Sequence, residues 1–372
     1  MSSGSFMDKL LDGVTVQWKR LGDVARIKNG KDHKTLGEGE FPVYGSGGIM
    51  RYADTYAYNK PSVLIPRKGS LGNLFFVDVP FWTVDTIFYT EIDEAQINPK
   101  YLYYFLTTVG LGEMNQAGGV PSQTQSVLNE LKIPIPSPEK PNKSLKIQGK
   151  IVRILDAFTE LTAELTAELT ARKSQYNYYR DQLLKFEEGD VEWKTLGDVA
   201  TIGTGSHDTQ DAIADGEYIF YARGRDPLRL NEFDFDETAI ITAGDGAGVG
   251  KVFHYAQGKY ALHQRAYRIV PGASINPRFV YHCIKSHFYA YIQKASVSSS
   301  VTSLRRPMFL NFPIPVPLIT EQARIVTILD QFDALTESLT EGLPREIELR
   351  QKQYEHYRDL LLSFPTPEEV EA

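Results

Sequence analysis

The run GDGAGVG at residues 244–250 has the residue types of a cofactor-binding loop. Glycines let backbone amides approach a dinucleotide or S-adenosylmethionine, but such a loop must also open a helix whose N-terminal amides hold the ligand. The residues that follow, KVFHYAQGKYALH (251–263), instead predict a strand, a turn and a second strand. The first half of the chain has KGSLGN (68–73) at the matching place. The pattern therefore favours a turn between strands over a cofactor loop.

Asn98-Pro99 and Asn276-Pro277 superficially resemble the Asn-Pro-Pro-Tyr/Phe motif with which amino-methyltransferases grip a flipped base, but both lack the second proline. Asparagine as a helix N-cap, with proline at the first helical position, explains both copies. The seven histidines show no metal-ligand spacing, and no Ser/His/Asp set or carboxylate pair repeats between the halves. We therefore predict no catalytic site and no metal site. The only cysteine, Cys283, is predicted to be a buried thiol without an internal disulfide partner.

The charges are distributed unevenly along the 372 residues. The formal net charge of −7 argues mildly against a nucleic-acid partner. Residues 251–310, however, contain nine Lys and Arg residues and no Asp or Glu, and residues 51–70 carry four cations against one Asp. A solvated face usually mixes both signs, so an all-cationic segment favours an anionic partner. Interleaved Tyr, His, Gln and Ser side chains are of types that contact base edges and phosphates.

A tandem duplication organises the chain, with Trp18 matching Trp193 at an offset of 175. VQWKRLGDVARIKNG (16–30) matches VEWKTLGDVATIGTG (191–205), KIPIPSP (132–138) matches NFPIPVP (311–317), and IVRILDAFTELT (151–162) matches IVTILDQFDALT (325–336). The unit is far longer than a solenoid repeat, so each half is expected to be a domain plus a connecting element. Each domain reads as short strands with glycine turns, a mixed α/β fold, and the proline-spaced segment is expected to leave it as an extended linker.

After each linker, apolar residues recur at spacings of three and four, which predicts a helix of about 40 residues and about 60 Å. In the second copy Gly342 and Pro344 are positioned to cap and restart the helix. Helices too long for their own domain to cover should pair as a coiled coil. The alternative is two separate amphipathic helices, and the narrow stripe favours pairing. The residues expected at this seam or at a partner surface are Leu161, Leu165, Leu169, Tyr176, Tyr179, Phe332, Leu335, Leu339, Tyr354 and Tyr357.

These motifs, together with the run ELTAELTAELTA at 160–171, resemble the specificity subunit of type I restriction-modification systems over nearly the whole chain. The resemblance implies two target recognition domains, each reading one half of a bipartite DNA site and held apart by two antiparallel helices that dock two methyltransferase subunits. It implies no catalytic residues in this chain. S-adenosylmethionine and ATP are then expected in partner subunits, including restriction subunits where present. The expected segments are a helical N-terminus (1–14), the first recognition domain (15–144), the central spacer helix (145–190), the second recognition domain (191–318) and the C-terminal spacer helix (319–372).

The recognition domains match poorly outside the shared motifs, so we expect an asymmetric target. Gly/Ser turns and basic residues that repeat in position are the predicted DNA contacts, although each could equally be an ordinary surface residue. They are Tyr44, Ser46, Arg67, Lys68, Ser70, Arg223, Arg225, Lys251, Arg265, Ser300, Arg305 and Arg306. Two other functions remain as alternatives. A stand-alone DNA adenine methyltransferase lacks support from both motifs above. A coiled-coil scaffold without DNA binding would be supported if the complex with its methyltransferase bound no DNA.

No stretch approaches the roughly 18 to 20 apolar residues of a membrane span, and the N-terminus lacks the layout of a secretion signal, so a cytoplasmic protein is expected. The TAEL units at 162–165 and 166–169 look like spacer repeats. One unit adds about 6 Å of helix and a net rotation of about 40°. One base pair adds about 3.4 Å and about 35°. An added unit is therefore predicted to lengthen the DNA spacer by one base pair.

Overall fold

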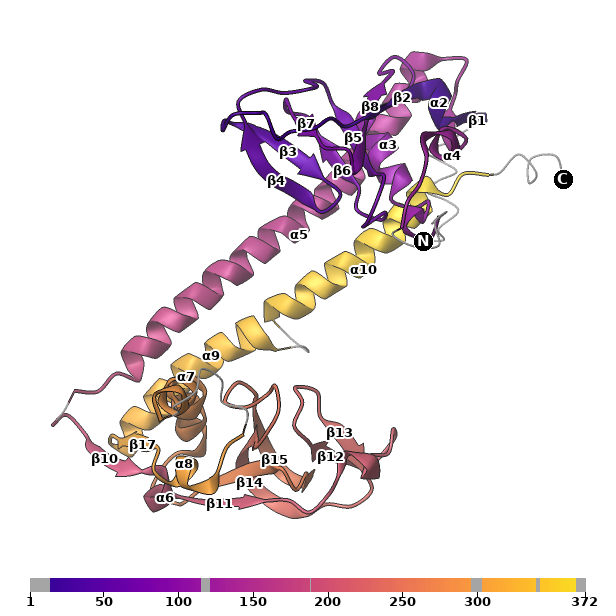
Figure 1. The fold of residues 1–372 in the computed structure, drawn as a ribbon. Coiled ribbons are helices and arrows are strands. Elements are labelled where there is room, and N and C mark those ends of the chain that lie inside the picture. Colours follow the sequence, from indigo (N-terminus) through magenta and orange to yellow (C-terminus); the bar gives the residue numbers. More distant parts are fainter. Residues whose placement is uncertain (1–13, 115–120, 188, 296–302, 339–341, 366–372) are drawn as a thin grey trace. The chain divides into compact units, whose positions relative to one another are not determined.

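The computed structural model describes residues 14–114, 121–187, 189–295, 303–338 and 342–365 (Figure 1). The chain divides into two compact units. The first unit comprises Met1–Leu165 and Ile347–Ala372, and the second comprises Thr166–Glu346. Within the described ranges, none of the helices is long and apolar enough to cross a membrane. Three predictions fall outside these ranges: the helical segment 1–14 up to residue 13, Ser300 and Leu339.

The first unit is built on an open four-stranded antiparallel sheet in the order β2–β8–β5–β6. These strands span Ala25–Asn29, Ile87–Ile92, Ser62–Pro66 and Phe75–Val77, respectively. Every residue of β5 is buried, as expected for a central strand. A smaller sheet, β4–β3–β7, comprises Gly48–Ala53, Phe41–Gly45 and Trp82–Thr83, with β3 and β7 parallel.

The second unit has one open six-stranded sheet in the order β11–β16–β14–β15–β12–β13. These strands span Ala200–Thr204, Ala266–Pro271, Phe235–Ala243, Phe253–Leu262, Tyr218–Tyr221 and Leu228–Leu230. The prediction of a strand, a turn and a strand over 251–263 was wrong, because β15 is a single strand. Its eight cross-strand pairs with β14 continue through Gly258, whose φ is +80°. This ladder outweighs the local turn preference of Gln257-Gly258.

The proline-spaced segments are strands rather than extended linkers, which corrects the prediction. β9 (Lys132–Pro136) pairs antiparallel with β1 (Val16–Arg20), and β17 (Pro313–Val316) pairs in the same way with β10 (Glu192–Thr195). The hydroxyl of Tyr101 donates to the carbonyl of Pro134 at 2.8 Å, so this proline faces away from β1. Alternate prolines therefore occupy positions that face away from the partner strand, where no backbone N–H is needed, and the intervening isoleucines form the hydrogen bonds of the ladder.

The duplicated LGDV motif forms a short helix at the start of each domain, namely α2 (Leu21–Val24) and α6 (Leu196–Val199), with its leucine and valine buried. Asp23 accepts from the backbone amide of Arg20 at 3.1 Å, and Asp198 accepts from that of Thr195 at 2.9 Å. Each aspartate thus satisfies an amide at the helix N-terminus. The motif is structural.

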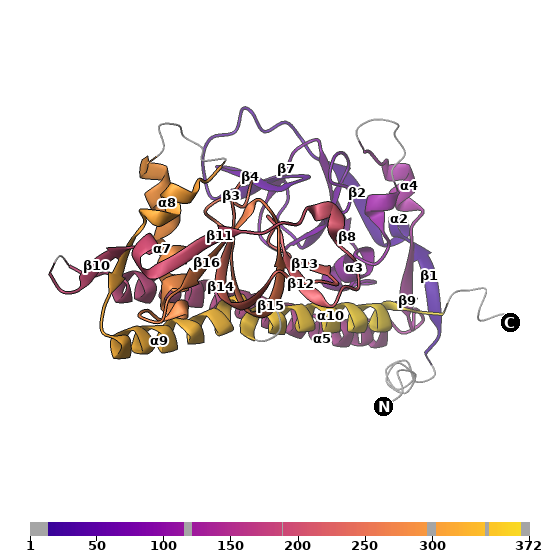
Figure 2. The same cartoon turned by 90° about the horizontal axis from the view of Figure 1, so that it is seen from below.

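Both predicted asparagine caps are present. The Asn98 side chain accepts from the amide of Lys100 at the start of α3 (Pro99–Leu106), and Asn276 accepts from that of Arg278 at the start of α7 (Pro277–Ala295). In the second unit α7 contacts β14, β15 and β16 as well as helix α9 (Ile319–Glu337), so it lies between the sheet and α9 (Figure 2). Two further short helices are α4 (Gln125–Asn129) and α8 (Arg306–Leu310), and two 3-10 turns are Leu111–Glu113 and Thr209–Asp211.

The long helix α5 covers Pro141–Leu183, 43 residues, and so begins before and ends before the predicted 145–190. The second long helix is broken into α9 and α10 (Gly342–Leu362) instead of running through 319–372. The break follows from Gly342, whose φ is +78° and which lies against the carbonyl of Ala334 too closely for a side chain. The predicted restart at this glycine is therefore observed.

The long helices pair within each unit. In the first unit α5 runs antiparallel to α10, and the ring of Phe158 stacks on that of Tyr357 at 5.3 Å (Figure 1). In the second unit Tyr176 and Tyr179 of α5 contact Phe332 of α9, each at 5.8 Å between ring centroids. Most predicted seam residues are buried or half-buried, whereas Tyr179 is exposed. The half-buried ones are Leu161, Leu165, Leu169, Phe332, Leu335, Tyr354 and Tyr357.

Candidate nucleic-acid interface

In each unit the predicted contact loops are held by the same pattern of backbone hydrogen bonds, which we call the common frame. In the first unit the amide of Arg67 donates to the carbonyl of Thr86 at 2.8 Å. In the second unit the amide of Gly244 donates to the carbonyl of Arg265 at 2.8 Å. These bonds make Thr86 equivalent to Arg265, and Arg67 equivalent to Gly244.

The next residues extend this equivalence. Lys68 forms an isolated bridge with Ser122, and Asp245 forms one with Ser303. Gly69 and Gly246, one position further along, both have φ of +84°. The expectation that basic residues repeat in position was therefore wrong, because Lys68 of the first unit corresponds to an acid in the second. Alignment by sequence missed this reversal because the loops share only glycines.

In the first unit, Ser46, Arg67, Lys68 and Ser70 are brought together at one end of the central sheet. The amide of Ser46 donates to the Thr86 hydroxyl at 3.3 Å, and its carbonyl accepts from the Asn73 side chain at 3.3 Å. These bonds join the turn after β3 to the loop after β5. Sequence reasoning missed Thr86 and Asn73, which hold the two loops together.

Tyr44 and Arg67 pack against aromatic rings, which the sequence did not predict. The Tyr44 ring contacts Phe75 at 5.7 Å and Phe81 at 6.4 Å, and burial raises the pKa of its hydroxyl above the ordinary value. The Arg67 guanidinium lies over the ring of Phe88 at 5.9 Å. Lys68 and Ser70 are exposed.

In the second unit, two predicted arginines converge on one carboxylate that sequence reasoning missed. Nη1 of Arg223 lies 2.9 Å from Oδ1 of Asp245, and Nη1 of Arg265 lies 3.1 Å from Oδ2. The hydrogen bond from Arg223, with a smaller one from Arg265, lowers the pKa of Asp245. We call these three residues the Asp245 cluster. Both arginines are thus ion-paired, and their contact with DNA stays a prediction.

Two histidines hold the backbone of this cluster. Nδ1 of His263 accepts from the amide of Arg265 at 2.9 Å, and the ring is 1% exposed. Burial lowers the pKa of His263 and that of His254, so both rings are neutral near pH 7. Nε2 of His254 lies 3.1 Å from the carbonyl of Gly224, next to Arg223. The two histidines thus hold in place the loops that carry Arg265 and Arg223.

The remaining predicted cations of the second unit are exposed. Within the described ranges no carboxylate lies within ion-pair distance of Arg225, Lys251, Arg305 or Arg306. Arg225 and Lys251 line one cavity of about 420 Å³, and the Lys251 ammonium lies over the ring of Tyr289 at 5.3 Å. These side chains are available to an anion.

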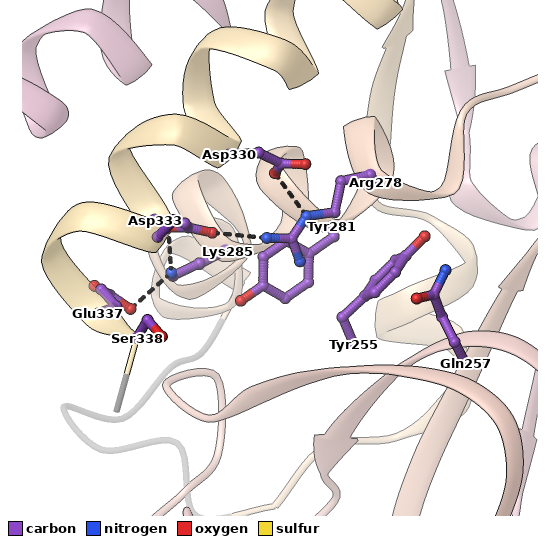
Figure 3. Close-up of a pocket in the computed structure, with 10 residues that line it drawn as sticks. Tyr255, Gln257, Arg278, Tyr281, Lys285, Asp330, Asp333, Glu337 and Ser338 are labelled. Atoms are coloured by element: carbon purple, nitrogen blue, oxygen red, sulfur yellow. Dashed lines mark hydrogen bonds and ion pairs between the residues drawn. The ribbon is translucent and has the colours of Figure 1, made fainter. Parts of the chain in front are cut away.

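Part of the cationic segment is neutralised by acids from α9, which its composition did not reveal. Arg278 bonds to Asp330 at 2.7 Å and Asp333 at 3.1 Å, and Lys285 bonds to Asp333 at 3.1 Å and Glu337 at 2.9 Å (Figure 3). They line a cavity of about 680 Å³. Two of these acids, with His282, have metal-ligand types and spacing. Their oxygens already receive hydrogen bonds from Arg278 and Lys285, so the cluster fits a domain-to-helix clamp better than a metal site.

Comparison with known proteins identifies the family. The model of the type I restriction modification DNA specificity domain matches residues 14–172 and again 188–349. The chain is 39% identical to the specificity subunit of the Escherichia coli type I restriction enzyme EcoR124I/EcoR124II, over 100% of both chains. It is 32% identical to the EcoprrI specificity subunit of Escherichia coli, over 92% of this chain and 93% of that one.

The fold is shared with a solved structure of much lower sequence identity. The S subunit of a type I restriction-modification system from M. genitalium superposes with a TM-score of 0.69 at 17% identity, covering 95% of this chain and 98% of that chain. One family model thus occurs twice, in the order of the internal repeat, and full-length relatives carry the same description. The chain belongs to the family of type I restriction-modification DNA specificity subunits, whose role is recognition rather than catalysis.

Proposed function

We propose that the two units read the two halves of an asymmetric, bipartite site in double-stranded DNA. This proposal rests on one observation: the two units share the same backbone frame but present different side chains on it. The amide of Val84 donates to the carbonyl of Tyr44 at 2.9 Å, as that of His263 does to Tyr221 at 3.0 Å, so Ser46 and Arg223, two positions further on, are equivalent. Ser46, Thr86 and Lys68 thus stand in the first unit where Arg223, Arg265 and Asp245 stand in the second. Equivalent backbones approach a duplex alike, whereas different donors and acceptors select different bases.

The proposed partners are two methyltransferase subunits, with restriction subunits where the system has them. Support for two docking sites comes from YNYYRD (176–181) and YEHYRD (354–359), one on each long helix. Tyr178 of the first copy is 63% exposed, although α5 packs against α9 through the neighbouring Tyr176 and Tyr179. A large exposed aromatic side chain of this kind is suited to contact with a partner protein. S-adenosylmethionine and ATP are proposed to bind in those partners, and the complex is proposed to act in the bacterial cytoplasm.

A stand-alone methyltransferase is the weaker candidate. Asn98 and Asn276 are engaged as helix caps, and residues 244–250 join two antiparallel strands without opening a helix. Neither segment has the context that base flipping or cofactor binding needs.

Methylome sequencing tests the proposal. The chain is expressed with its methyltransferase in a host without adenine methylation, and methylated adenines are mapped. One bipartite motif with unlike halves is expected. A palindromic motif, methylation without the partner, or no sequence-dependent methylation would contradict the proposal.

A further inference from the structure

The Asp245 cluster places a carboxylate between two arginines on a surface proposed to meet DNA. The Asp245 side chain is 25% exposed, and its two arginine partners are 41% and 63% exposed, so all three reach solvent. A site that binds phosphate gains from each added cation and loses from each added carboxylate. Asp245 therefore has no favourable role in a purely electrostatic contact.

A carboxylate is favourable where the orientation of donors matters more than their charge. Each arginine uses Nη1 for Asp245, which leaves Nη2 and Nε for another partner. A guanidinium held in one plane can donate two parallel hydrogen bonds to O6 and N7 of guanine in the major groove. A flexible arginine could make the same bonds only by losing more side-chain entropy.

The frame beneath the cluster limits movement of both arginines. His263 binds the amide of Arg265, and His254 binds the carbonyl of Gly224 beside Arg223. The loop that carries Asp245 is tied on both sides, since the amide of Gly244 donates to Arg265 and its carbonyl accepts from Leu304 at 2.7 Å. Such preorganisation is expected of groups that discriminate between bases.

We propose that Asp245 holds Arg223 and Arg265 as a paired fork that reads guanine in the half-site of the second unit. This inference rests on the proposed DNA recognition and adds its chemistry. The first unit reads its half-site differently, because Lys68 occupies the place of Asp245 and the hydroxyls of Ser46 and Thr86 replace the two arginines.

The test uses the complex of the full chain with its methyltransferase and the motif mapped above. Binding is measured by fluorescence anisotropy on duplexes in which each guanine is replaced in turn by 7-deazaguanine, which lacks the N7 acceptor. The wild-type complex is expected to lose about tenfold in affinity or more at a guanine of one half-site. Arg223→Lys and Arg265→Lys keep the charge but remove the planar fork, so in each variant the loss should shrink toward onefold at the guanine that the replaced arginine reads.

Asp245→Asn distinguishes the proposed orienting role of the carboxylate from a purely structural or purely electrostatic role. Removing the carboxylate should increase affinity for unrelated DNA while discrimination at the read guanine falls. Asp215→Asn is the matched control, because Asp215 is an exposed acid of the same unit that lies outside the Asp245 cluster. It should leave discrimination unchanged. Thermal unfolding of each complex verifies folding, and the two lysine variants test the inference if Asp245→Asn is unstable.

Three results would overturn the inference: full discrimination in all variants, an Asp245→Asn effect equal on every duplex, or lost discrimination confined to adenine or cytosine. The last would mean that Asp245 itself accepts from a base amino group. If the wild-type complex binds without sequence preference, the proposed function fails; if it is specific and the variants match it, only this inference fails.

Discussion

The backbone amide of Asn98 donates a hydrogen bond to Oε1 of Gln148 at 2.7 Å. Gln148 lies on α5 and is completely buried, and its amide nitrogen donates to Ser144 and to the carbonyl of Gln96. The second unit repeats the contact between Asn276 and a glutamine of α9 at 2.8 Å. A buried glutamine thus fixes each long helix to the N-cap of the domain helix.

Replacing this glutamine should weaken the first unit. Gln148→Ala removes three hydrogen bonds and leaves the Asn98 amide without this acceptor, so the free energy of unfolding should fall by about 1–3 kcal/mol. Denaturant titration followed by circular dichroism measures the change. Gln182→Ala, at an exposed position of the same helix, should change stability by less than about 0.5 kcal/mol. Equal effects of the two substitutions would contradict the assigned role.

The clamp in Figure 3 should make the second unit sensitive to acid. Burial alone would raise the pKa of Asp330, but hydrogen bonds from His282 and Arg278 outweigh it and lower the pKa. A carboxyl with a lowered folded pKa stabilises fully above its unfolded pKa of about 4 and loses that contribution as pH falls through the folded value. The melting temperature of Asp330→Asn should therefore lie below wild type at pH 7 and approach it below about pH 4. A gap independent of pH would refute this assignment.

Adding one TAEL unit after Leu169 should change the spacing of the DNA site and not its bases. The rotation of about 40° per unit matches one base pair, although the rise of about 6 Å is nearly that of two. Methylome sequencing of the insertion variant should show the same two half-sites with one more unspecified base pair. Inserting four alanines is the control, because a geometric effect needs only the helix length. Altered specified bases would exclude the ruler mechanism.

Exposed cations should act on all DNA sequences alike. Arg305→Gln and Arg306→Gln each remove a charge that lacks a described carboxylate partner. If each contacts a phosphate, affinity should fall for specific and unrelated duplexes together, and the slope of log K against log salt should decrease by about 1. Arg324→Gln is the control, since Arg324 is paired with Glu321 on α9. A loss confined to one base position would show base reading instead.

Cys283 should be inert in the native chain. The thiol is 2% exposed, and burial raises its pKa far above the ordinary value, so little thiolate forms at neutral pH. Labelling with a thiol reagent at pH 8 should be slow in native protein and fast in denaturant. Rapid native labelling at one equivalent would disprove the burial. Cys283→Ala supplies the blank.

The sequence alone determined the elements that depend on local pattern. The duplication, the asparagine caps and the paired stripes are encoded within a few turns or strands, where propensity and spacing act directly. The break at Gly342 was also predictable, because only glycine adopts that backbone conformation without strain.

Tertiary structure alone decided which charges meet. Arg278 and Asp330 lie 52 positions apart, and Arg265 and Asp245 lie 20 apart. The charge count of residues 251–310 therefore overstated their free positive charge, because the acids that pair with Arg265 and Arg278 lie outside this segment. The equivalence of Lys68 and Asp245 likewise depends on backbone hydrogen bonds between distant strands, which no local pattern encodes. Local residues specify the frame, and long-range pairing specifies the chemistry presented on it.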